Sequence, residues 1–344
     1  MLYDVIEKKQ KGLELNKQDW QIALSSTSPI EELSALLMAI KYMGLSFNET
    51  TELTEILANS GTKFNCFNDN GYVDLHSTGG VGDKCTLIAC PIVASLGMKI
   101  PKMAGRSLGN TGGTIDKLEK SFDNINLSPT PDEFISWVNT SGFAITEQTN
   151  DFTPLDGKLY ALRSRTATAE CLPLIASSIM SKKIAMGCPN IVLNVTYGNG
   201  ALMKTPEEAK TLAETMVAIG ENLGKRVKVV YTSMDYPLGK TVGNKIEVYE
   251  AIKILSGEWQ TKALDVSLQL AEQMLELTQG RTNTHNLCME QIRNGKALQK
   301  FQEFIETQGG IFAEPKLENV VKVANKTATE VAIIARESDV LYDN

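Results

Sequence analysis

The stretch DLHSTGGVGDKCTLIAC, residues 74–90, decides the fold because it wraps a run of small residues between two apolar segments. Glycines have no side chain to block a ligand, and hydroxyl groups add donors, so such a loop can surround an anion with N–H and O–H groups. The loop offers these groups at Ser77, Thr78, Gly79, Gly80 and Gly82. A helix that begins near Thr86 would point the positive end of its dipole at the same place. The stretch therefore predicts an anion-binding loop.

The loop follows neither of the common phosphate-loop patterns. A Walker loop requires Gly-Lys-Ser/Thr, and this chain has Asp83-Lys84-Cys85 instead; the Rossmann pattern also fails. A glycine loop by itself is as compatible with a tight turn as with a ligand site. A second cluster, GRSLGNTGGTIDKLE at residues 105–119, again combines glycines with Thr111 and Thr114. Two such loops predict one anion enclosed from two sides.

Length and charge narrow the class of protein. The chain has 344 residues, more than the about 250–300 residues at which single cores stop growing, which favours two domains. Its 41 acidic residues exceed its 34 basic ones, whereas proteins that bind nucleic acid normally carry a basic face, so we expect no nucleic-acid partner. The start, MLYDVIEKKQKG, lacks the apolar core of a signal peptide. No apolar run approaches the about 20 residues that cross a bilayer. We expect a cytoplasmic protein without a membrane partner.

Cysteine and histidine usage argues against a metal or redox centre. The six cysteines show no CxxC spacing, which is typical of reduced, buried thiols. The only histidines are His76 and His285, too few for a histidine-rich metal site. We expect no metal, redox or organic cofactor.

The order of apolar patterns indicates a helical start followed by an α/β region. A capping box at Ser28-Pro29-Ile30-Glu31 and a cap at Asn48 predict two helices within residues 1–65. Residues 159–187 are expected to form a helix pair at a domain junction. NIVLNV and RVKVVYTS flank a helix that starts at Thr205, which favours parallel strands. We expect helices at 262–279 and 286–306, and a short β-like tail, NVVKVANKTATEVAIIAR, after them.

Three long motifs, HSTGGVGD, GRSLGNTGGTIDKLE and PLIASSIMSKK, occur in an order that resembles the thymidine and pyrimidine-nucleoside phosphorylases. The resemblance extends from the amino terminus to about residue 257, and the fold is shared with anthranilate phosphoribosyltransferase. It implies a small helical domain, residues 1–65 and 155–188, and a larger α/β domain with a mixed, mainly parallel sheet, residues 66–154 and 189–344. It also implies a homodimer, with a cleft between the domains.

The resemblance assigns candidate site residues. Catalytic roles fall to His76, Arg163 and Lys182; substrate binding to Tyr160, Ser178 and Thr111; phosphate binding to Ser77, Gly79, Gly80, Thr86 and Thr114. In a helix, positions 178 and 182 lie on one face. Ser178 can then bond a pyrimidine edge, while Arg163 and Lys182 can stabilise the negative charge of a departing base. His76 is expected near the pyrimidine O2.

The anion site departs from the family pattern. The family usually has Lys before the His-Ser pair, with that Lys on the phosphate, and this chain has Leu75; a phosphate-binding Ser is replaced by Ala104. Loss of the cation could weaken phosphate binding by about 1.5–3 kcal/mol. Lys84 or Lys102 could replace it. Other outcomes left open are a nucleosidase, a transferase to another small acceptor, or a protein that only binds nucleosides.

Two further departures concern a cation site and the carboxyl end. Some relatives bind potassium through groups that match Leu238, Thr241 and Glu250. We predict that the Lys84 ammonium pairs with Glu250 and takes that place; an alternative is that Lys84 points to solvent. The stretch EPKLENVVKVANKTATEVAIIAR, from residue 314, resembles only the beginning of a longer β-rich segment in the phosphorylases. The expected reaction is reversible cleavage of a pyrimidine nucleoside, such as thymidine or uridine, by phosphate to free base and pentose 1-phosphate.

Overall fold

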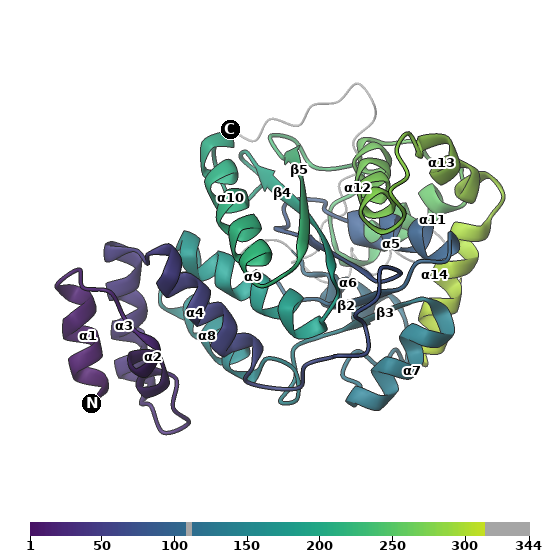
Figure 1. Cartoon of the computed structure of the whole chain (residues 1–344). Coiled ribbons are helices and arrows are strands. Elements are labelled where there is room, and N and C mark those ends of the chain that lie inside the picture. Colours follow the sequence, from purple (N-terminus) through teal and green to yellow (C-terminus); the bar gives the residue numbers. More distant parts are fainter. Residues whose placement is uncertain (108–111, 314–344) are drawn as a thin grey trace.

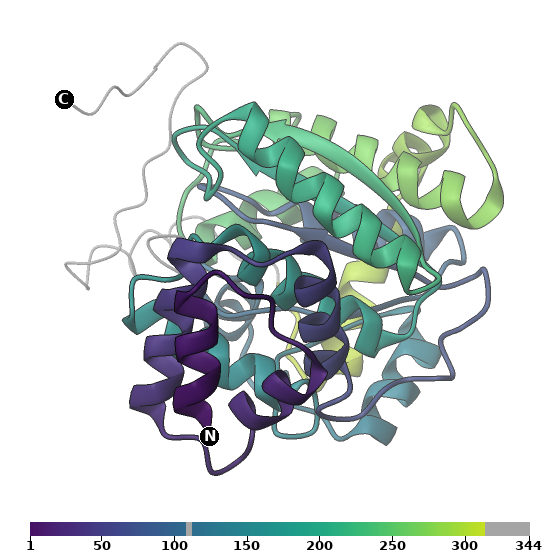
Figure 2. The same ribbon diagram turned by 60° about the vertical axis from the view of Figure 1, so that its left-hand side comes forward.

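The computed structural model describes residues 1–107 and 112–313 (Figure 1). Its amino-terminal part is a group of helices whose apolar sides share one core with Leu159 and Leu162 of a later helix. These helices are α1 (Leu2–Gln10), α2 (Lys17–Ala23), α3 (Ile30–Met43), α4 (Phe47–Ala58) and α8 (Pro154–Arg165). Figure 2 brings α1–α4 to the front, where they pack as a group on one side of the strands.

Two expected helix starts differ from the structure. The capping box at Ser28 is wrong, because the N-cap of α3 is Pro29 without a side-chain hydrogen bond. The Ser28 hydroxyl instead donates to the Ile22 carbonyl at 3.1 Å. The second helix is capped by Ser46, with a reciprocal bond from Glu49, rather than by Asn48. Both helices were expected at about the right place, but their caps depend on how the preceding turn folds.

The strands confirm the expected α/β class, and every described pairing is parallel. One sheet has the order β1-β4-β5 and a second pairs β2 with β3. The strands are β1 (Val73–Ser77), β2 (Ile100–Met103), β3 (Phe143–Thr146), β4 (Asn190–Tyr197) and β5 (Arg226–Ser233). A bridge between Tyr72 and Lys99 brings the two sheets together next to β1. The carboxyl ends of the strands in both sheets therefore point in the same direction.

Helices cover the sheets on both faces. Figure 1 shows α10 on one side of β4 and β5 and α12 on the other, as a parallel sheet requires. The remaining helices of this part are α5 (Cys85–Ser95), α6 (Thr114–Ser121), α7 (Pro131–Ser141), α10 (Pro206–Asn222), α11 (Asn244–Leu255), α12 (Lys262–Gln279), α13 (His285–Arg293) and α14 (Lys296–Thr307). The single helix expected at 286–306 is wrong, because Gly295 has φ +76° and separates α13 from α14. The expected β-like tail lies outside the described residues.

Helix α9 (Leu172–Met186) joins the two parts. Every residue from Leu174 to Met186 is buried, since α9 packs against α4, α10 and β2. Its first turns share the core of the amino-terminal helices, whereas Ile175 and Ile179 pack with β4 and α10. The division into a helical and an α/β domain stays a prediction, but α9 carries its side chains to the region where both parts meet.

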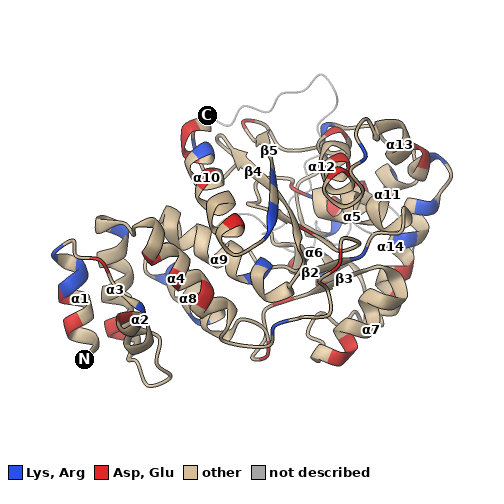
Figure 3. Cartoon of the chain, viewed as in Figure 1, with Lys and Arg blue, Asp and Glu red and all other residues tan. Residues whose placement is uncertain are grey.

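Acidic and basic residues occur together on the outer helices (Figure 3). Figure 3 shows acidic and basic residues interspersed along outer helices such as α1 and α10, in a chain whose formal net charge is −7. Within the described ranges, no helix is long and apolar enough to span a membrane.

Candidate functional site

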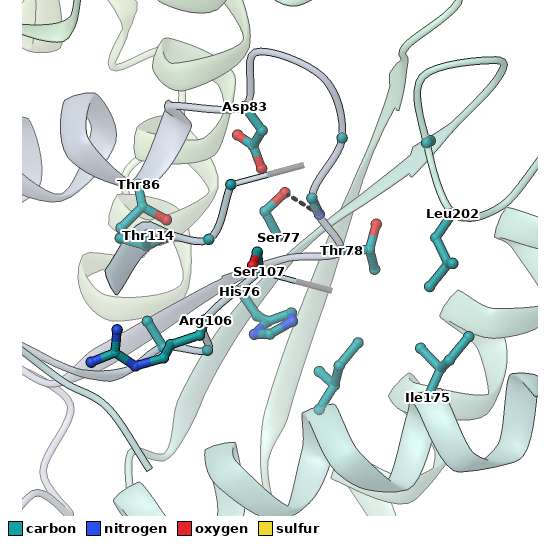
Figure 4. A pocket seen from close by; sticks show the side chains of 18 of the residues that line it. His76, Ser77, Thr78, Asp83, Thr86, Arg106, Ser107, Thr114, Ile175 and Leu202 are labelled. Carbon is teal, nitrogen blue, oxygen red and sulfur yellow. Dashed lines mark hydrogen bonds between the residues drawn. The ribbon is translucent and has the colours of Figure 1, made fainter. Parts of the chain in front are cut away.

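A cavity of about 460 Å³ lies where the amino-terminal helices meet the strands. Its wall combines the two glycine clusters with residues of α8 and α9 and a loop after β4. Figure 4 shows His76, Ser77 and Thr78 leaving β1 at its centre, with Ile175 and Leu202 on one side and Thr86 and Thr114 on the other. The predicted anion loops and the predicted base site therefore line one cavity.

The first loop needs glycine for steric reasons. Gly82 has φ +80°, and a Cβ there would lie 2.6 Å from the Leu238 carbonyl oxygen. Gly80 has φ +140° and would approach the Gly200 carbonyl oxygen at 3.1 Å. Within the described residues, the Gly80 N–H has no acceptor, while the Gly79 N–H donates to Ser77 Oγ at 3.2 Å (Figure 4). The tight turn therefore leaves the Gly80 N–H available as a main-chain donor at the end of β1.

Two helix amino termini reach the same cavity. The Lys84 side chain does not cap α5, and α6 follows Gly113, which has no capping side chain to offer. Thr86 and Thr114 lie in the first turns of these helices, and both line the cavity (Figure 4). Free N–H groups and hydroxyls at two helix starts favour an anion. Ser77, Gly79, Gly80, Thr86 and Thr114 are thus brought together, whereas Thr111 lies outside the described residues.

Leu75 and Ala104, the two positions that differ from the family pattern, bring neither a charge nor a hydroxyl group to the cavity. Leu75 is fully buried in the main apolar core, next to side chains of α5. Ala104 lines the cavity with a methyl group only. The anion side therefore depends on main-chain donors, on hydroxyls and on whichever other cations face it.

Lys84 does not point to solvent. Its Nζ atom donates to the Leu238 carbonyl at 2.7 Å, to the Thr241 carbonyl at 3.1 Å and to Glu250 Oε2 at 2.9 Å. Burial raises the pKa of Glu250, but the Lys84 charge and the donors around the carboxylate outweigh this effect and lower it overall. The predicted pair with Glu250 is present, and all three ammonium protons have acceptors. The residues do not fit an additional cation, because Lys84 Nζ already occupies the acceptors that would bind it.

The part of the cavity that is predicted to bind the base is centred on Lys182 of α9; it is called the base side below. Its Nζ atom contacts Asp156 Oδ2 at 2.5 Å and Ser178 Oγ at 3.1 Å, and it lies 5.5 Å from the centre of the Tyr160 ring. Burial lowers the pKa of Lys182, an effect that Asp156 opposes. The helical spacing of Ser178 and Lys182 is confirmed. Asp156 was missed, although Asp156, Tyr160 and Arg163 follow one face of a helix at spacings of four and three.

Arg163 enters from α8, as expected, but its guanidinium makes no ion pair within the described residues. It donates to the Leu174 carbonyl at 3.0 Å and to the Ala169 carbonyl at 2.7 Å. Burial lowers the pKa of Arg163. Burial also raises the pKa of Tyr160 to about 12, so this hydroxyl stays protonated near neutral pH. The base side combines a fixed positive charge with a neutral donor.

His76 lines the cavity between the two sides. Its Nδ1 atom is buried and has no hydrogen-bond partner among the described residues. Burial and the charges of Lys183, Lys102 and Lys182 hold the pKa of His76 well below its usual value. The imidazole is therefore neutral near pH 7 and can donate one proton and accept another.

Sequence reasoning gave no role to Ser107, and it named Lys102 only as a possible replacement. Ser107 also lines the cavity; a hydroxyl within the second glycine cluster was the signal. Lys102 lines the cavity although its side chain is almost fully buried. Arg106 points away from the centre (Figure 4) and pairs with Glu119 and Glu147.

Comparisons with known proteins agree with this geometry. A family model described as "Glycosyl transferase family, a/b domain" matches residues 69–298. The chain is 44% identical to a pyrimidine-nucleoside phosphorylase of Staphylococcus haemolyticus over 318 residues, which cover 90% of this chain and 73% of that protein. The pyrimidine-nucleoside phosphorylase of Bacillus subtilis is also 44% identical, with the same coverage. The crystal structure of anthranilate phosphoribosyltransferase from Thermus thermophilus has the same fold, with a TM-score of 0.70 and 16% identity over 89% of this chain and 99% of that one.

Proposed function

Because the chain belongs to the pyrimidine-nucleoside phosphorylase family, we propose that its cavity cleaves a pyrimidine nucleoside with phosphate, giving free base and pentose 1-phosphate. One observation supports the assignment of residues: a single cavity is lined by both glycine clusters and by basic residues of α8 and α9. That arrangement suits a reaction in which an anion attacks a sugar while a base leaves with negative charge.

The base departs toward α8 and α9. Lys182 and Arg163 stabilise the negative charge that develops on the pyrimidine, and Ser178 and Tyr160 supply neutral hydrogen-bonding groups at its edge. Asp156 neutralises Lys182 in the resting cavity, so Arg163 provides the uncompensated positive charge on this side. Carbonyl contacts at 2.7 and 3.0 Å fix the guanidinium before the base arrives, which reduces the reorganisation needed during the reaction.

His76 acts as a neutral group in this proposal. An imidazole with a strongly lowered pKa is a poor source of a full proton near pH 7, but it can donate a hydrogen bond to the pyrimidine O2. Its buried Nδ1 atom lacks a partner within the described chain. A substrate group that satisfies this ring would therefore remove an existing energetic cost.

Phosphate binds opposite the base, against the glycine loops. Ser77, Thr86 and Thr114 offer hydroxyls, and Gly79 and Gly80 lie in the turn that presents main-chain N–H groups. Two helix starts add their positive ends. This placement puts the nucleophile and the leaving group on opposite sides of the pentose, as direct displacement requires.

The choice of nucleoside, the oligomeric state, the location in the cell and domain closure are also proposals. We infer that thymidine and uridine are both candidate substrates, because the cavity residues named above address the pyrimidine and the anion and do not select between pentoses. The resemblance favours a homodimer through the helical domain, a cytoplasmic location and closure of the two domains during turnover. The relatives at 43–44% identity that are named pyrimidine-nucleoside phosphorylases favour neither a nucleosidase nor a nucleoside-binding protein.

The test incubates the purified protein with thymidine or uridine, with and without inorganic phosphate, and follows release of the base. Release that requires phosphate is expected. Release at the same rate without phosphate would indicate a hydrolase and contradict the proposal. Binding of nucleoside with no release under either condition would also contradict it and indicate a binding protein.

A further inference from the structure

Two adjacent hydroxyl groups line the cavity at the end of β1. Ser77 is the last residue of this strand and Thr78 follows it (Figure 4). A hydroxyl group has one proton to donate and two lone pairs with which to accept. An anion only accepts, so a hydroxyl binds it well where the hydroxyl proton is not already bonded to the protein. The hydrogen bonds of Ser77 and Thr78 therefore decide which of them can bind an anion.

The Thr78 hydroxyl bonds to β4 with its proton as well as its oxygen. Thr196 Oγ1 donates to the Gly79 carbonyl, so it accepts in its contact with Thr78 Oγ1 at 2.9 Å. Thr78 therefore donates its proton to Thr196. Its oxygen also accepts from the Thr196 main-chain N–H at 2.9 Å. This hydroxyl holds the loop against β4 and keeps no proton for a ligand.

The Ser77 hydroxyl is bonded in the opposite sense. Its oxygen accepts from Asn194 Nδ2 at 3.2 Å and from the Gly79 N–H at 3.2 Å. These two bonds use both lone pairs of the oxygen. Within residues 1–107 and 112–313, the Ser77 proton has no acceptor, and the residue lines the cavity. Ser77 is therefore a donor toward the cavity, which suits a ligand that accepts hydrogen bonds.

The direction of the Asn194–Ser77 bond depends on the next strand of the sheet. Asn194 of β4 is fully buried and lies opposite Ser77 in the strand register. Its Oδ1 atom accepts from Thr232 Oγ1 of β5 at 2.7 Å, and only 3% of the Thr232 surface is exposed. If the amide turned around, Oδ1 would accept the Ser77 proton, and the buried Thr232 proton would lose the acceptor that it has in the described part of the chain. Because an unpaired buried donor is unfavourable, Thr232 favours the amide orientation in which Ser77 donates to the cavity.

We propose that Thr232 is a positioning residue for the reaction: through the Asn194 amide it keeps the Ser77 hydroxyl oriented as a donor toward the bound anion. Three neighbouring strands contribute one group each, in the order β5, β4 and β1, and every bond points toward the ligand. Neither Thr232 nor Asn194 lines the cavity, so both act through Ser77. The inference rests on the proposed function, since it takes the anion at Ser77 to be phosphate.

Two substitutions of Thr232 separate a hydrogen-bonding role from a packing role. Thr232→Val keeps the shape of the side chain and removes the hydroxyl, so the Asn194 amide loses its preferred orientation. The KM for phosphate should then rise about 3- to 10-fold, which corresponds to one neutral hydrogen bond. Thr232→Ser keeps the hydroxyl and removes the methyl group, so the KM for phosphate should stay within about twofold of that of the unmodified protein. In both variants, the KM for the nucleoside and kcat at saturating phosphate should change by less than about twofold.

Thr146→Val is the matched control. Thr146 is a fully buried threonine of β3 that does not line the cavity, and its hydroxyl donates to the Glu147 carbonyl at 3.0 Å. Loss of this hydroxyl should leave the KM for phosphate unchanged. Two results would overturn the inference: a KM for phosphate that Thr232→Val leaves unchanged, or one that Thr232→Ser or Thr146→Val raises as much as Thr232→Val does.

A double variant tests whether the effect of Thr232 passes through Ser77. In a Ser77→Ala protein, adding Thr232→Val should raise the KM for phosphate no further, because the hydroxyl that Thr232 orients is gone. If Thr232→Val raises the KM by the same factor with and without Ser77, the two residues act independently and the inference is wrong.

Calorimetric titration with inorganic phosphate separates this inference from the proposed function. If the unmodified protein releases no base but binds phosphate, and Thr232→Val weakens that binding while Thr232→Ser does not, the function is wrong and the Thr232 assignment stands. If base release requires phosphate and Thr232→Val binds phosphate as tightly as the unmodified protein, the function stands and the assignment is wrong. Absence of phosphate binding to the unmodified protein would overturn both.

Discussion

Replacing Lys84 with alanine should convert a cation-independent protein into one that potassium stabilises. The buried pair of Lys84 and Glu250 has fully buried side chains and an N–O distance of 2.9 Å. Removing the ammonium leaves the Glu250 carboxylate buried beside the Leu238 and Thr241 carbonyls. Such an unpaired charge costs about 3–5 kcal/mol. At about 2 °C per kcal/mol for a chain of this size, the melting temperature should fall by about 6–10 °C.

The space vacated by the Lys84 side chain adds a prediction about ions. Two carbonyl oxygens and a carboxylate form an oxygen-rich pocket that can accept a monovalent cation in place of the ammonium. Thermal unfolding of Lys84→Ala should therefore occur at a higher temperature in potassium chloride than in sodium chloride of equal concentration. The unmodified protein should show equal melting temperatures in the two salts, because its own ammonium fills the site.

The control for this experiment is Lys210→Ala. Lys210 is exposed and lies 3.8 Å from Glu214 one turn along α10, so its loss should change the free energy of unfolding by less than about 0.5 kcal/mol. Two results would refute the reasoning: a potassium-specific rise in the melting temperature of the unmodified protein, or a Lys84→Ala protein as stable as the Lys210→Ala control.

Three other variants test separate parts of the site. Asp156→Asn should lower kcat/KM for the nucleoside about 10- to 100-fold, with the phosphate KM unchanged in steady-state assays, because Lys182 loses a charge-assisted bond. Gly82→Ala should weaken phosphate binding and lower the free energy of unfolding by about 2 kcal/mol or more in denaturant titrations, because the new Cβ would lie 2.6 Å from the Leu238 carbonyl oxygen. The control is Gly224→Ala. Gly224 has φ +74° and open space around it, so this variant should show the backbone strain alone. Lys102→Met should raise the free energy of unfolding below pH 8 by up to about 3 kcal/mol in denaturant titrations. This gain should shrink between pH 8 and 10.5, where the folded protein loses the Lys102 proton before the unfolded chain does.

The sequence predicted the features that depend on local chemistry. Glycines with hydroxyl neighbours implied the loops after β1 and β2, and the spacing of Ser178 and Lys182 implied a shared helix face. The Thr205 cap of α10 followed from the same kind of local rule and is confirmed. These groups act through neighbours close in the chain, which a sequence pattern can show.

Features that depend on distant contacts were harder to predict. Ser28 bonds to Ile22 across a turn instead of capping its helix, and no spacing rule indicates this choice. The Lys102 ammonium contacts the Leu75 carbonyl although the two residues are 27 positions apart in the sequence, because their strands lie side by side. The break between α13 and α14 had a visible signal, Asn294-Gly295, which is typical of a turn, but the apolar pattern continued through it.

The central claim is that the two sides of one cavity bind phosphate and pyrimidine at the same time and join phosphate to the pentose. Phosphorus-31 NMR of the protein with uridine and inorganic phosphate tests it most directly. We predict a new resonance of a sugar phosphate ester that grows in step with free uracil. Uracil that accumulates while all the phosphate remains inorganic would contradict the account.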